Sequence, residues 1–600
     1  MNAGRIEGGG GGVVFFPDGQ PGIAGAALLA GNNTIVTNKG ALISGTAAVI
    51  FEGNNNTLTL WQGSTTTGDV RFLGAGNTLA IGSDFNRPTA QVLVTGSVDF
   101  GGGIFAVRLV PGQADQLTVT GNARLSSATV KVSTGAGSYD TRTLYPILRA
   151  QDTFNDTRFA SVSADLAFLT PTLVYSADDK DVTLKFILKQ VPPETNPGNP
   201  AGAGVGNPVA PPTRPIRFAD LVFSRNGIAT ANAVDSMPVT HEVYRHALNL
   251  PNGAPPSFFS TLSGETHASA VSALQGVSSQ ARNVPLAQLR ANLGAGLRPG
   301  APVAAAGVSD VAPAASALPT PSVQPAWAQV VGNWQRLGAT GDTAAVRQHT
   351  GGVFAGADAA VGRGWRLGGA VGYTDSNVRT DGVDARTNIA SYSAIVYGGK
   401  AFDAGPGKLS LMLGAAYSWH DISTQRRIAV GGLDQTLRAD YGASTTQVFT
   451  ELGWALKAGD TLTLEPYAGV AWAGLRTRAF SESGGSAALS GASQTSTTTT
   501  TTLGVRARQE WMLGTTAGAV TGGLGWRHAF GDVTPTSRMA FDAGDTFTVA
   551  GAPIARDAAL IEAGLDAAIG RSATVGLSYA GQFGARNQDH SATLSWRWAF

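Results

Sequence analysis

Histidine, cysteine and serine side chains limit the chemistry that this chain can do. Its 600 residues include seven histidines and no cysteine, and the first histidine is His241. Residues 1–190 therefore lack the general base of a Ser-His-Asp triad and the imidazole of the usual metal sites. They also contain no Gly-x-Ser-x-Gly sequence. We predict no catalytic residue, no cofactor and no metal site, and a protein that is not an enzyme.

Two other groups of polar residues have simpler explanations. The acidic run SADDKDV (176–182) is typical of a hairpin turn, with a calcium site as the less favoured alternative. His267 and Glu265 lie close together on an expected helix, but no nucleophile has a comparable setting there. We interpret His267 as structural.

Composition excludes several classes of protein. Charged residues make up 14% of the chain and the net charge is +1, too neutral for a protein that binds nucleic acid through its phosphates. No run of 18 apolar residues is present, so we predict no spanning helix. The N-terminal sequence MNAGRIEGGGGGVVFF has no apolar segment followed by a cleavage site. An exported form of this chain would therefore need a leader that is missing by truncation or by the choice of start.

The first part of the chain is weakly repetitive. GNNTIV (31–36), GNNNTLTL (53–60) and GAGNTLAIG (74–82) share an Asn-Thr-aliphatic core, with threonines 23 and 21 residues apart. A period near 20 is typical of a parallel β-helix. We predict a right-handed β-helix over residues 1–94, short or truncated, with Asn33, Asn56 and Asn77 stacked. A β-sandwich with Asn-rich turns is the alternative.

The next two regions differ from the first in amino-acid composition. Residues 95–190 have denser aromatic and aliphatic residues, which indicates a β cap that covers the last coil. Residues 191–325 begin and end with Pro/Gly-rich or Ala/Pro-rich stretches. Between these stretches we predict helices over 231–237, 241–250, 263–275 and 285–293.

From residue 326 to residue 600 the chain alternates with period 2 between turns. We predict twelve strands: 326–338, 347–362, 364–380, 384–402, 407–428, 436–457, 460–480, 492–514, 516–531, 555–569, 572–585 and 588–600. The number is even, as in a closed up-and-down barrel.

The two faces of these strands indicate which side meets lipid. One face carries large apolar residues, and the other carries small residues with ten charges, too little volume to fill a soluble core. We therefore predict a transmembrane barrel with the apolar face toward lipid and closure that leaves no open edge. The lumen-facing charges are structural in this interpretation; the alternative is that some of them line a helix or an unfolded chain that passes through the pore. These residues are Arg366, Glu451, Glu465, Arg506, Arg508, Glu510, Arg527, Glu562, Asp566 and Arg597. His420 and Asp421 are expected to form a polar pair at headgroup level.

The whole layout resembles the autotransporters (type V secretion) of Gram-negative bacteria. The segments that carry the resemblance are LSGETHASAVSALQ (262–275), GWRLGGAVGYT (364–374), AYSWHDISTQR (416–426), GWRHAFGDVTP (525–535) and FTVAGAPIARDAALIEAGLD (547–566). Residues 115–184 resemble the autochaperone unit of that family. The final residues, with Trp596, Trp598 and Phe600, resemble the signal that the barrel-insertion machinery reads.

The resemblance implies an all-β protein with a partly helical linker, of which a part threads the pore. It implies an outer-membrane barrel that exports its own N-terminal passenger to the cell surface, where the passenger stays or is released. We expect a passenger for adhesion or display; the alternatives are a hydrolytic passenger or a plain outer-membrane pore. The implied partners are outer-membrane lipid, the insertion machinery, periplasmic chaperones and an unknown host or cell-surface ligand, with a monomeric barrel.

Two details of the linker follow from the same resemblance. The segment before Trp327 is rich in proline. A pore helix therefore lies further upstream, or the threading segment is partly extended. Some autotransporters cut themselves between passenger and barrel, and Asn226, Asn232 and Asp235 are residues of the kind that such chemistry uses. No motif here is specific enough to assign cleavage.

Overall fold

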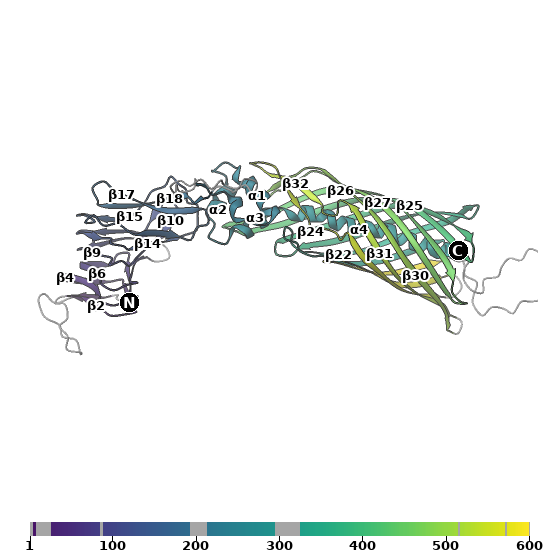
Figure 1. The fold of residues 1–600 in the computed structure, drawn as a ribbon, viewed down its shortest axis with the longest axis horizontal. Helices are drawn as coiled ribbons and strands as arrows, with labels where there is room; N and C mark the ends of the chain where they lie inside the picture. The colour runs from purple at the N-terminus through teal and green to yellow at the C-terminus, as the bar shows by residue number, and fades with distance from the viewer. Residues whose placement is uncertain are drawn as a thin grey trace, which may run out of the picture. The chain divides into compact units, whose positions relative to one another are not determined.

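The computed structural model describes residues 4–7, 26–83, 88–192, 213–294, 325–513, 516–569 and 573–598. These residues form two compact units, one built mainly from residues up to 222 and one that holds the C-terminal strands (Figure 1). Among the described residues, no helix combines the length and the apolar character that a membrane crossing needs.

Twelve antiparallel strands of the second unit close into a barrel. The strands are β21 Ala326–Leu337, β22 Val346–Gly362, β23 Trp365–Thr380, β24 Asp384–Ala404, β25 Gly407–Val430, β26 Leu433–Lys457, β27 Leu462–Thr477, β30 Gln494–Leu513, β31 Thr516–Gly531, β34 Asp557–Ile569, β35 Ala573–Gly584 and β36 Asn587–Trp598. The seam joins β21 to β36, from Ala326 opposite Trp598 to Leu337 opposite Asn587. The predicted barrel is confirmed, and each predicted strand coincides with an observed one.

Alternation within each strand sorts the side chains to two faces. The large apolar residues point outward and are exposed, for example Leu524, Val371 and Leu577, which are 68%, 64% and 60% accessible. Inward positions carry buried polar residues such as Gln447 and Thr445. A soluble barrel would bury its apolar face, so this distribution fits a barrel whose outer solvent is lipid.

The two ends of the barrel differ. Residues 363–364, 405–406 and 458–461 connect strands at the end that we call the short-turn end. Residues 478–493 and 532–556 connect strands at the other, long-loop end, and they contain a four-stranded sheet. Its strands are β28 Phe480–Ser481, β29 Leu489–Gly491, β32 Thr536–Phe541 and β33 Phe547–Ala550. Short strands inside long loops are hard to predict, because their pairing is non-local.

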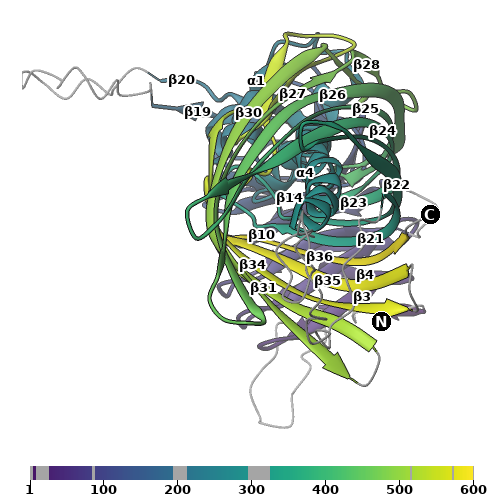
Figure 2. The same cartoon turned by 90° about the vertical axis from the view of Figure 1, so that its right-hand side faces the viewer.

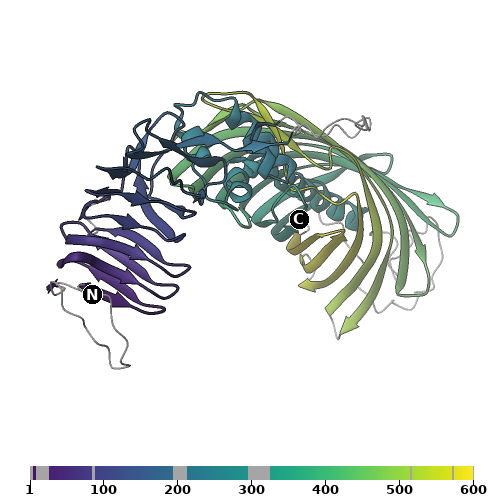
Figure 3. The ribbon, with the colours of Figure 1, turned by 60° about the vertical axis from the view of Figure 1, so that its left-hand side comes forward.

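The first unit is a solenoid of two parallel sheets, seen as successive rungs in Figure 3. One sheet contains β3 Ile35–Asn38, β5 Thr57–Trp61, β7 Thr78–Gly82, β10 Ile104–Val110, β11 Gln113–Ala114, β14 Thr129–Thr134 and β16 Ser161–Ala164. The other contains β1 Arg5–Glu7, β2 Leu28–Ala30, β4 Ala41–Phe51, β6 Thr65–Phe72, β8 Gln91–Thr95, β9 Val98–Asp99, β12 Gln116–Val119, β13 Ala123–Arg124, β15 Tyr145–Ala150, β17 Leu169–Tyr175 and β18 Asp181–Leu188. The solenoid is confirmed over the β-sandwich alternative.

The asparagine stack is real, but its first member differs from the prediction. Ile35 pairs with Thr57, and Thr57 pairs with Thr78, so Thr34 rather than Asn33 lies in line with Asn56 and Asn77. Asn56 Oδ1 accepts from the Thr34 amide at 2.7 Å, and Asn77 Oδ1 accepts from the Asn56 amide at 2.8 Å. Asn33 is exposed and takes a positive φ of 56° instead. In the first coil, Ile35 rather than Thr34 pairs with Thr57, so the threonine spacing is wrong by one residue there.

Replacing Asn77 with alanine is expected to destabilise the solenoid locally by about 1–3 kcal/mol, the cost of leaving a buried amide without its acceptor. Asn77 is 1% accessible, and its amide also donates to the carbonyls of Gly53 and Gly74. Hydrogen exchange of residues 53–80 would measure the loss. Asn54→Ala is the matched control, because Asn54 makes the same kind of bond, to the Ala75 amide, at an exposed position. Equal effects of the two changes would contradict this account.

Parallel pairing passes residue 94 without a break and continues to β15 and β16. The antiparallel hairpin of β17 and β18 then ends the stack, and the predicted turn of the SADDKDV run joins its strands, with Asp179 at a φ of 59°. Burial raises the pKa of Tyr139, inside this end of the unit, to about 12. Its hydroxyl donates to the carbonyl of Leu109. The boundary proposed between solenoid and cap stays a prediction.

The linker contains β19 Gln190–Val191, β20 Arg214–Pro215, the 3₁₀ helix η1 Phe218–Leu221 and four α-helices. The α-helices are α1 Arg225–Asp235, α2 Glu242–Leu248, α3 Pro255–Leu262 and α4 Glu265–Leu293. The prediction placed a break between residues 275 and 285, and this part was wrong, because α4 runs through it. The predictions that fall on residues 193–212 and 295–324 lie outside the described residues.

Candidate functional site

Helix α4 lies inside the ring of barrel strands, as the end-on view in Figure 2 shows. Its 29 residues correspond to about 44 Å of helix at 1.5 Å per residue. That length is close to the full thickness of a bilayer with its headgroups, about 40–45 Å. Helix α4 contacts β21 to β25 and β27, which lie on one side of the barrel.

Packing in the lumen explains why α4 is continuous through two residues that weaken helices. Gly276 lies so close to β21 that a Cβ there would be 2.8 Å from the side-chain oxygen of Gln335. Pro285 lacks an amide hydrogen and removes one helix bond. Most residues of α4 are nevertheless buried against the barrel wall. The wall supplies the stability that helix propensity does not.

Apolar contacts hold α4 along its length. Leu289 and Leu293 belong to a cluster with Trp327, Tyr397 and Phe449 of the barrel. Trp327 is 1% accessible, and its indole nitrogen donates to the Tyr397 hydroxyl at 2.8 Å. Val271 and Leu274 join a second cluster nearer the long-loop end. The inner wall therefore includes apolar patches where the helix docks, in addition to its polar residues.

A buried ionic cluster fixes the start of α4 at the long-loop end. Arg426 of β25 binds both carboxylate oxygens of Glu482, each at 2.7 Å, and Glu482 also bonds His267 of α4 at 2.8 Å. These three side chains are at most 4% accessible. The ring of Phe480 stacks on His267, with centroids 4.0 Å apart. One carboxylate thus joins the barrel wall, a long loop and the helix.

The loop after β33 binds the same end of α4 through its backbone. The Ala552 amide donates to Ser269 Oγ at 3.0 Å, and Ser272 Oγ donates to the Ala552 carbonyl. Gly551 packs so tightly that a Cβ would lie 2.4 Å from the carbonyl carbon of Ala268. Only glycine fits this approach. Helix and loop are therefore docked at close range.

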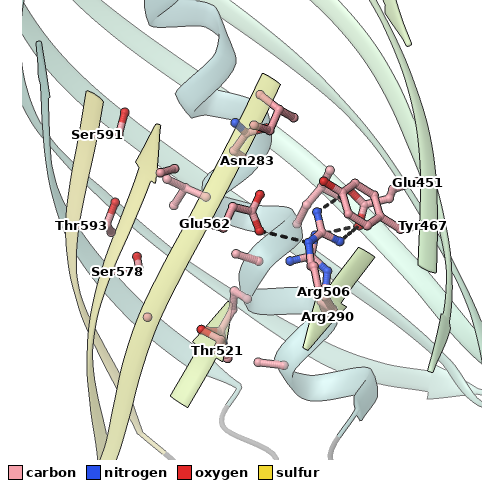
Figure 4. A pocket seen from close by; sticks show the side chains of 18 of the residues that line it. Asn283, Arg290, Glu451, Tyr467, Arg506, Thr521, Glu562, Ser578, Ser591 and Thr593 are labelled. Carbon is pink, nitrogen blue, oxygen red and sulfur yellow. Dashed lines mark hydrogen bonds and ion pairs between the residues drawn. The ribbon is translucent and has the colours of Figure 1, made fainter. Parts of the chain in front are cut away.

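A second ionic cluster, shown in Figure 4, lies near the C-terminal end of α4. Arg290 of the helix donates to Glu451 of β26 at 2.7 Å, and Arg506 of β30 donates to the same carboxylate at 2.8 Å. Glu465 lies 3.7 Å from Arg290 and 3.6 Å from Arg506. Arg506 also binds Glu562 at 3.1 Å. Opposite charges therefore compensate one another across four wall strands and the helix.

Further along the helix, Asn292 donates to both oxygens of Asp358 on β22, at 3.1 and 2.9 Å. Asp358 is 2% accessible and binds Arg366 of β23 at 2.5 Å. The last turn of α4 is thus held by a buried carboxylate that is itself neutralised. Both ionic clusters and this pair orient the helix by direct contact.

A cavity of about 420 Å³ remains beside α4. It lies between the helix face with Arg282, Asn283 and Ala287 and the wall formed by β30, β31 and β34 to β36. Threonine and serine side chains, such as Thr521, Ser578 and Thr593, line much of that wall (Figure 4). The helix therefore fills one side of the lumen and leaves a polar space on the other.

Nine of the ten predicted lumen charges line this cavity, and the tenth, Arg366, binds Asp358 instead. Asp566 binds Arg597, and Arg508 lies 3.4 Å from Asp566 and 3.5 Å from Glu510. Arg527 lines the cavity without a carboxylate oxygen within 4.0 Å in the described part of the chain. The partners Arg290, Asp358, Arg426 and Glu482 were not predicted as site residues. Inward alternation was the available signal for Asp358 and Arg426 on the wall strands, but not for Glu482 in a long loop or for Arg290 on the helix.

Other predicted residues have simple locations. Trp596 points outward and is 47% accessible, Trp598 is half-buried, and Phe600 lies outside the described residues. The predicted polar pair of His420 and Asp421 is wrong, because successive strand residues point to opposite faces. His420 is buried in the lumen between Ser391 and Thr445, whereas Asp421 is exposed outside.

Asn226 of α1, one of the three residues considered for self-cleavage, has a structural environment. Its side chain donates to the Ala550 carbonyl and accepts from the Ala550 amide, both at 2.8 Å. These two bonds tie α1 to β33 in the way that strands pair. Within the described residues, no group of three or more His, Cys, Asp or Glu residues has an arrangement that could hold a metal ion.

Comparison with known proteins finds matches for the C-terminal part. The family model described as Autotransporter beta-domain matches residues 326–580. Two curated proteins of Serratia marcescens, both named Extracellular serine protease, are 34% and 33% identical over 276 residues. This match covers 46% of this chain and 26% of each relative, so the chain spans about a quarter of their length.

Solved structures of similar barrels are also known. The translocator domain of the autotransporter NalP from Neisseria meningitidis is 17% identical, with a TM-score of 0.37, and covers 46% of this chain and 88% of that one. The beta domain of the Bordetella autotransporter BrkA is 20% identical, with a TM-score of 0.34, and covers 46% of this chain and 100% of that one.

The expectation that the protein is not an enzyme is corrected by these relatives. Both curated relatives carry the name of a secreted protease. The expectation rested on residues 1–190 alone, which lack histidine. The absence of a triad in one region does not exclude catalysis by the whole protein.

Proposed function

The C-terminal part of the chain is an autotransporter beta-domain, and we propose that this barrel exports the residues that precede it to the cell surface. The barrel lies in the outer membrane, with its exposed apolar face toward lipid. Outer-membrane barrels have short periplasmic turns and longer extracellular loops. The short-turn end is therefore periplasmic and the long-loop end is extracellular in this proposal.

The observation that supports export best is the position of α4. Its first residues bind the long loops through Glu482 and Ala552, and its last residues bind the wall through Asp358. The Asp358 amide also donates to the carbonyl of Pro325, directly before the first barrel strand. Helix α4 and β21 thus both have an end near Asp358, at the short-turn end. The chain before α4 leaves the barrel at the extracellular end.

This arrangement is the one expected after export. The passenger has left through the lumen, α4 has entered last, and its ionic and apolar contacts hold it there. Trp596, Trp598 and Phe600 serve as the insertion signal in this proposal, with the insertion machinery and periplasmic chaperones as partners of the unfolded chain. We also propose that the barrel acts as a monomer, which its closure by twelve strands of one chain supports.

Surface proteolysis tests the export proposal. Intact cells that express the chain behind a secretion leader are treated with a protease, and fragments of residues 26–192 and of the barrel are detected separately. We expect the solenoid to be digested while the barrel stays protected and migrates in a heat-modifiable form. A periplasmic marker that stays intact shows that the membrane is sealed. A protected solenoid on cells with a folded barrel would rule out self-export.

A second proposal concerns the exported part. The names of the Serratia marcescens relatives favour a hydrolytic passenger, specifically a serine protease, over the adhesive or display role. The first histidine of this chain is His241, so a Ser-His-Asp triad needs its histidine from outside the solenoid. The catalytic groups of such a passenger are therefore to be sought in the whole exported protein.

Labelling of intact cells with a fluorophosphonate probe distinguishes the two roles. A hydrolytic passenger is expected to give a labelled surface band that disappears when the catalytic serine, located by mass spectrometry of the adduct, is changed to alanine. Cells with the surface-exposed solenoid and no specific adduct would leave adhesion or display as the role of the passenger.

A further inference from the structure

Four arginines lie side by side on the outer face of the barrel near its long-loop end. Arg336 of β21 pairs with Arg347 of β22, Arg347 pairs with Arg379 of β23, and Arg379 pairs with Arg386 of β24. All four are exposed. We call these residues the arginine row. With neighbouring strands about 4.8 Å apart, the row spans about 15 Å from its first to its last strand.

The arginine row is electrostatically unfavourable by itself. Like charges directly opposite each other on neighbouring strands destabilise a sheet, and here three such pairs follow one another. Arg347 binds Asp381 at 2.9 Å. For the other three arginines, no carboxylate oxygen of the described residues lies within the 4.0 Å that defines an ion pair. Asp384 and Asp434, two of the acidic residues near the row, lie beside Arg427, which binds Asp434 at 3.2 Å.

The position of the row relative to the apolar band is also specific. Trp334, which is 49% accessible, lies two residues from Arg336 toward the short-turn end. On β23 the exposed Tyr373 lies six residues from Arg379, about 20 Å along the strand. Aromatic residues of this kind mark the membrane interface of outer-membrane barrels. The row therefore begins next to an exposed aromatic residue on β21 and lies further toward the long-loop end on β23, on the headgroup side of the apolar band.

We propose that the arginine row binds phosphate groups of lipid headgroups in the outer leaflet. Guanidinium groups bind phosphate in bidentate fashion, and a layer of phosphates would compensate the four adjacent cations. The long arginine stems cover apolar surface while their charged ends reach the headgroups. The row thus recognises a bisphosphorylated or multiply phosphorylated amphiphile that several arginines contact at once. That the row faces the outer leaflet rests on the barrel orientation given under the proposed function. Binding of phosphate by the row does not depend on that orientation.

Native mass spectrometry of the full chain in detergent, titrated with diphosphoryl lipid A, tests the proposal. The double variant Arg379→Gln with Arg386→Gln is expected to bind this lipid at least about ten-fold more weakly than the unchanged chain, since each basic residue contributes near an anionic surface. Arg538→Gln with Arg556→Gln is the matched control, because both arginines are exposed at the same end but lie outside the row. The control is expected to bind within about two-fold of the unchanged chain.

Further ligands in the same experiment distinguish lipid-bound phosphate from free phosphate. Phosphatidylcholine, which has no net charge, and inorganic phosphate are each expected to bind no better to the unchanged chain than to the double variant. Arg379→Lys with Arg386→Lys keeps the charge but loses the bidentate guanidinium groups, and it is expected to restore only part of the affinity. Heat-modifiable migration checks that each variant folds. If the double variant does not fold, lipid A binding of Arg336→Gln is compared with that of the unchanged chain instead. Equal binding of lipid A to the row variants and the unchanged chain, or equal binding of inorganic phosphate and lipid A, would overturn the proposal.

Discussion

Replacing Arg426 with methionine is expected to lower the free energy of unfolding of the barrel by about 3–5 kcal/mol, the usual effect of removing one partner from a buried ion pair. Among the described residues, the substitution leaves the Glu482 carboxylate, which is 1% accessible, with His267 and the Leu489 amide as its hydrogen-bond partners. It also removes the bond from Arg426 to the Ala487 carbonyl. Two-state unfolding in urea, followed by heat-modifiable migration, would measure the change.

The neighbouring residue supplies the control. Like Arg426, Arg427 is an arginine of β25 with a carboxylate partner, Asp434 at 3.2 Å. Both of these side chains, however, are more than half exposed. Arg427→Met is expected to change stability by less than about 1 kcal/mol, because exposed ion pairs contribute little. A loss from Arg426→Met no larger than that from Arg427→Met would show that the buried cluster does not hold the helix end.

Replacing Glu451 with alanine is expected to cost about 3 kcal/mol, the lower end of the range for a broken buried pair. Glu451 is the shared partner of Arg290 and Arg506, and among the described residues its loss leaves Glu465 as the one carboxylate within 4.0 Å of Arg290. The C-terminal end of α4 should therefore loosen. We expect the mean ion current through the reconstituted full chain to rise, as measured in planar bilayers.

Glu562→Ala is the matched control for this prediction. Glu562 binds the same Arg506 at 3.1 Å, but in the described part of the chain it forms no ion pair with α4, and its side chain is 38% exposed. We expect less than about 1 kcal/mol of destabilisation after allowing for solvent screening, and no rise in current. If both glutamates gave the same rise in current, the change would come from the wall charges and not from release of the helix.

The barrel could be predicted in detail because its strands are long. In strands of 12 to 25 residues, the alternation of apolar and polar residues fixes which face each side chain occupies. A register shift of one residue would move every apolar side chain to the wrong face. The ten lumen charges follow from the same alternation. Which charges meet could not be predicted, since Arg290 and Glu451 are 161 residues apart and come together only when α4 enters the lumen.

The failures have equally specific causes. Gly276 and Pro285 are ordinary helix-breaking signals, and they were overridden because most residues of the helix are buried inside the barrel. The stack of Asn56 and Asn77 was predicted, but Asn33 was assigned from a threonine spacing that the first coil does not keep. The strands β28, β29, β32 and β33 have two to six residues each and pair across long loops, so no local pattern marks them.

The central claim is that α4 lies inside the barrel of the exported protein, and cysteine cross-linking tests it most directly. The chain has no native cysteine, so an engineered pair reports only on itself. The hydroxyl oxygens of Thr266 on α4 and Thr380 on β23 are 3.0 Å apart, a separation that a disulfide can replace. Arg379 precedes Thr380 on the same strand but points outside.

In intact cells whose solenoid is accessible to protease, Thr266→Cys with Thr380→Cys is expected to form a disulfide under mild oxidation. Thr266→Cys with Arg379→Cys is expected to stay reduced. Rapid cross-linking of the first pair alone is the result that a helix docked in the lumen predicts. Absence of that cross-link in a folded, heat-modifiable barrel, or equal cross-linking of both pairs, would contradict the account.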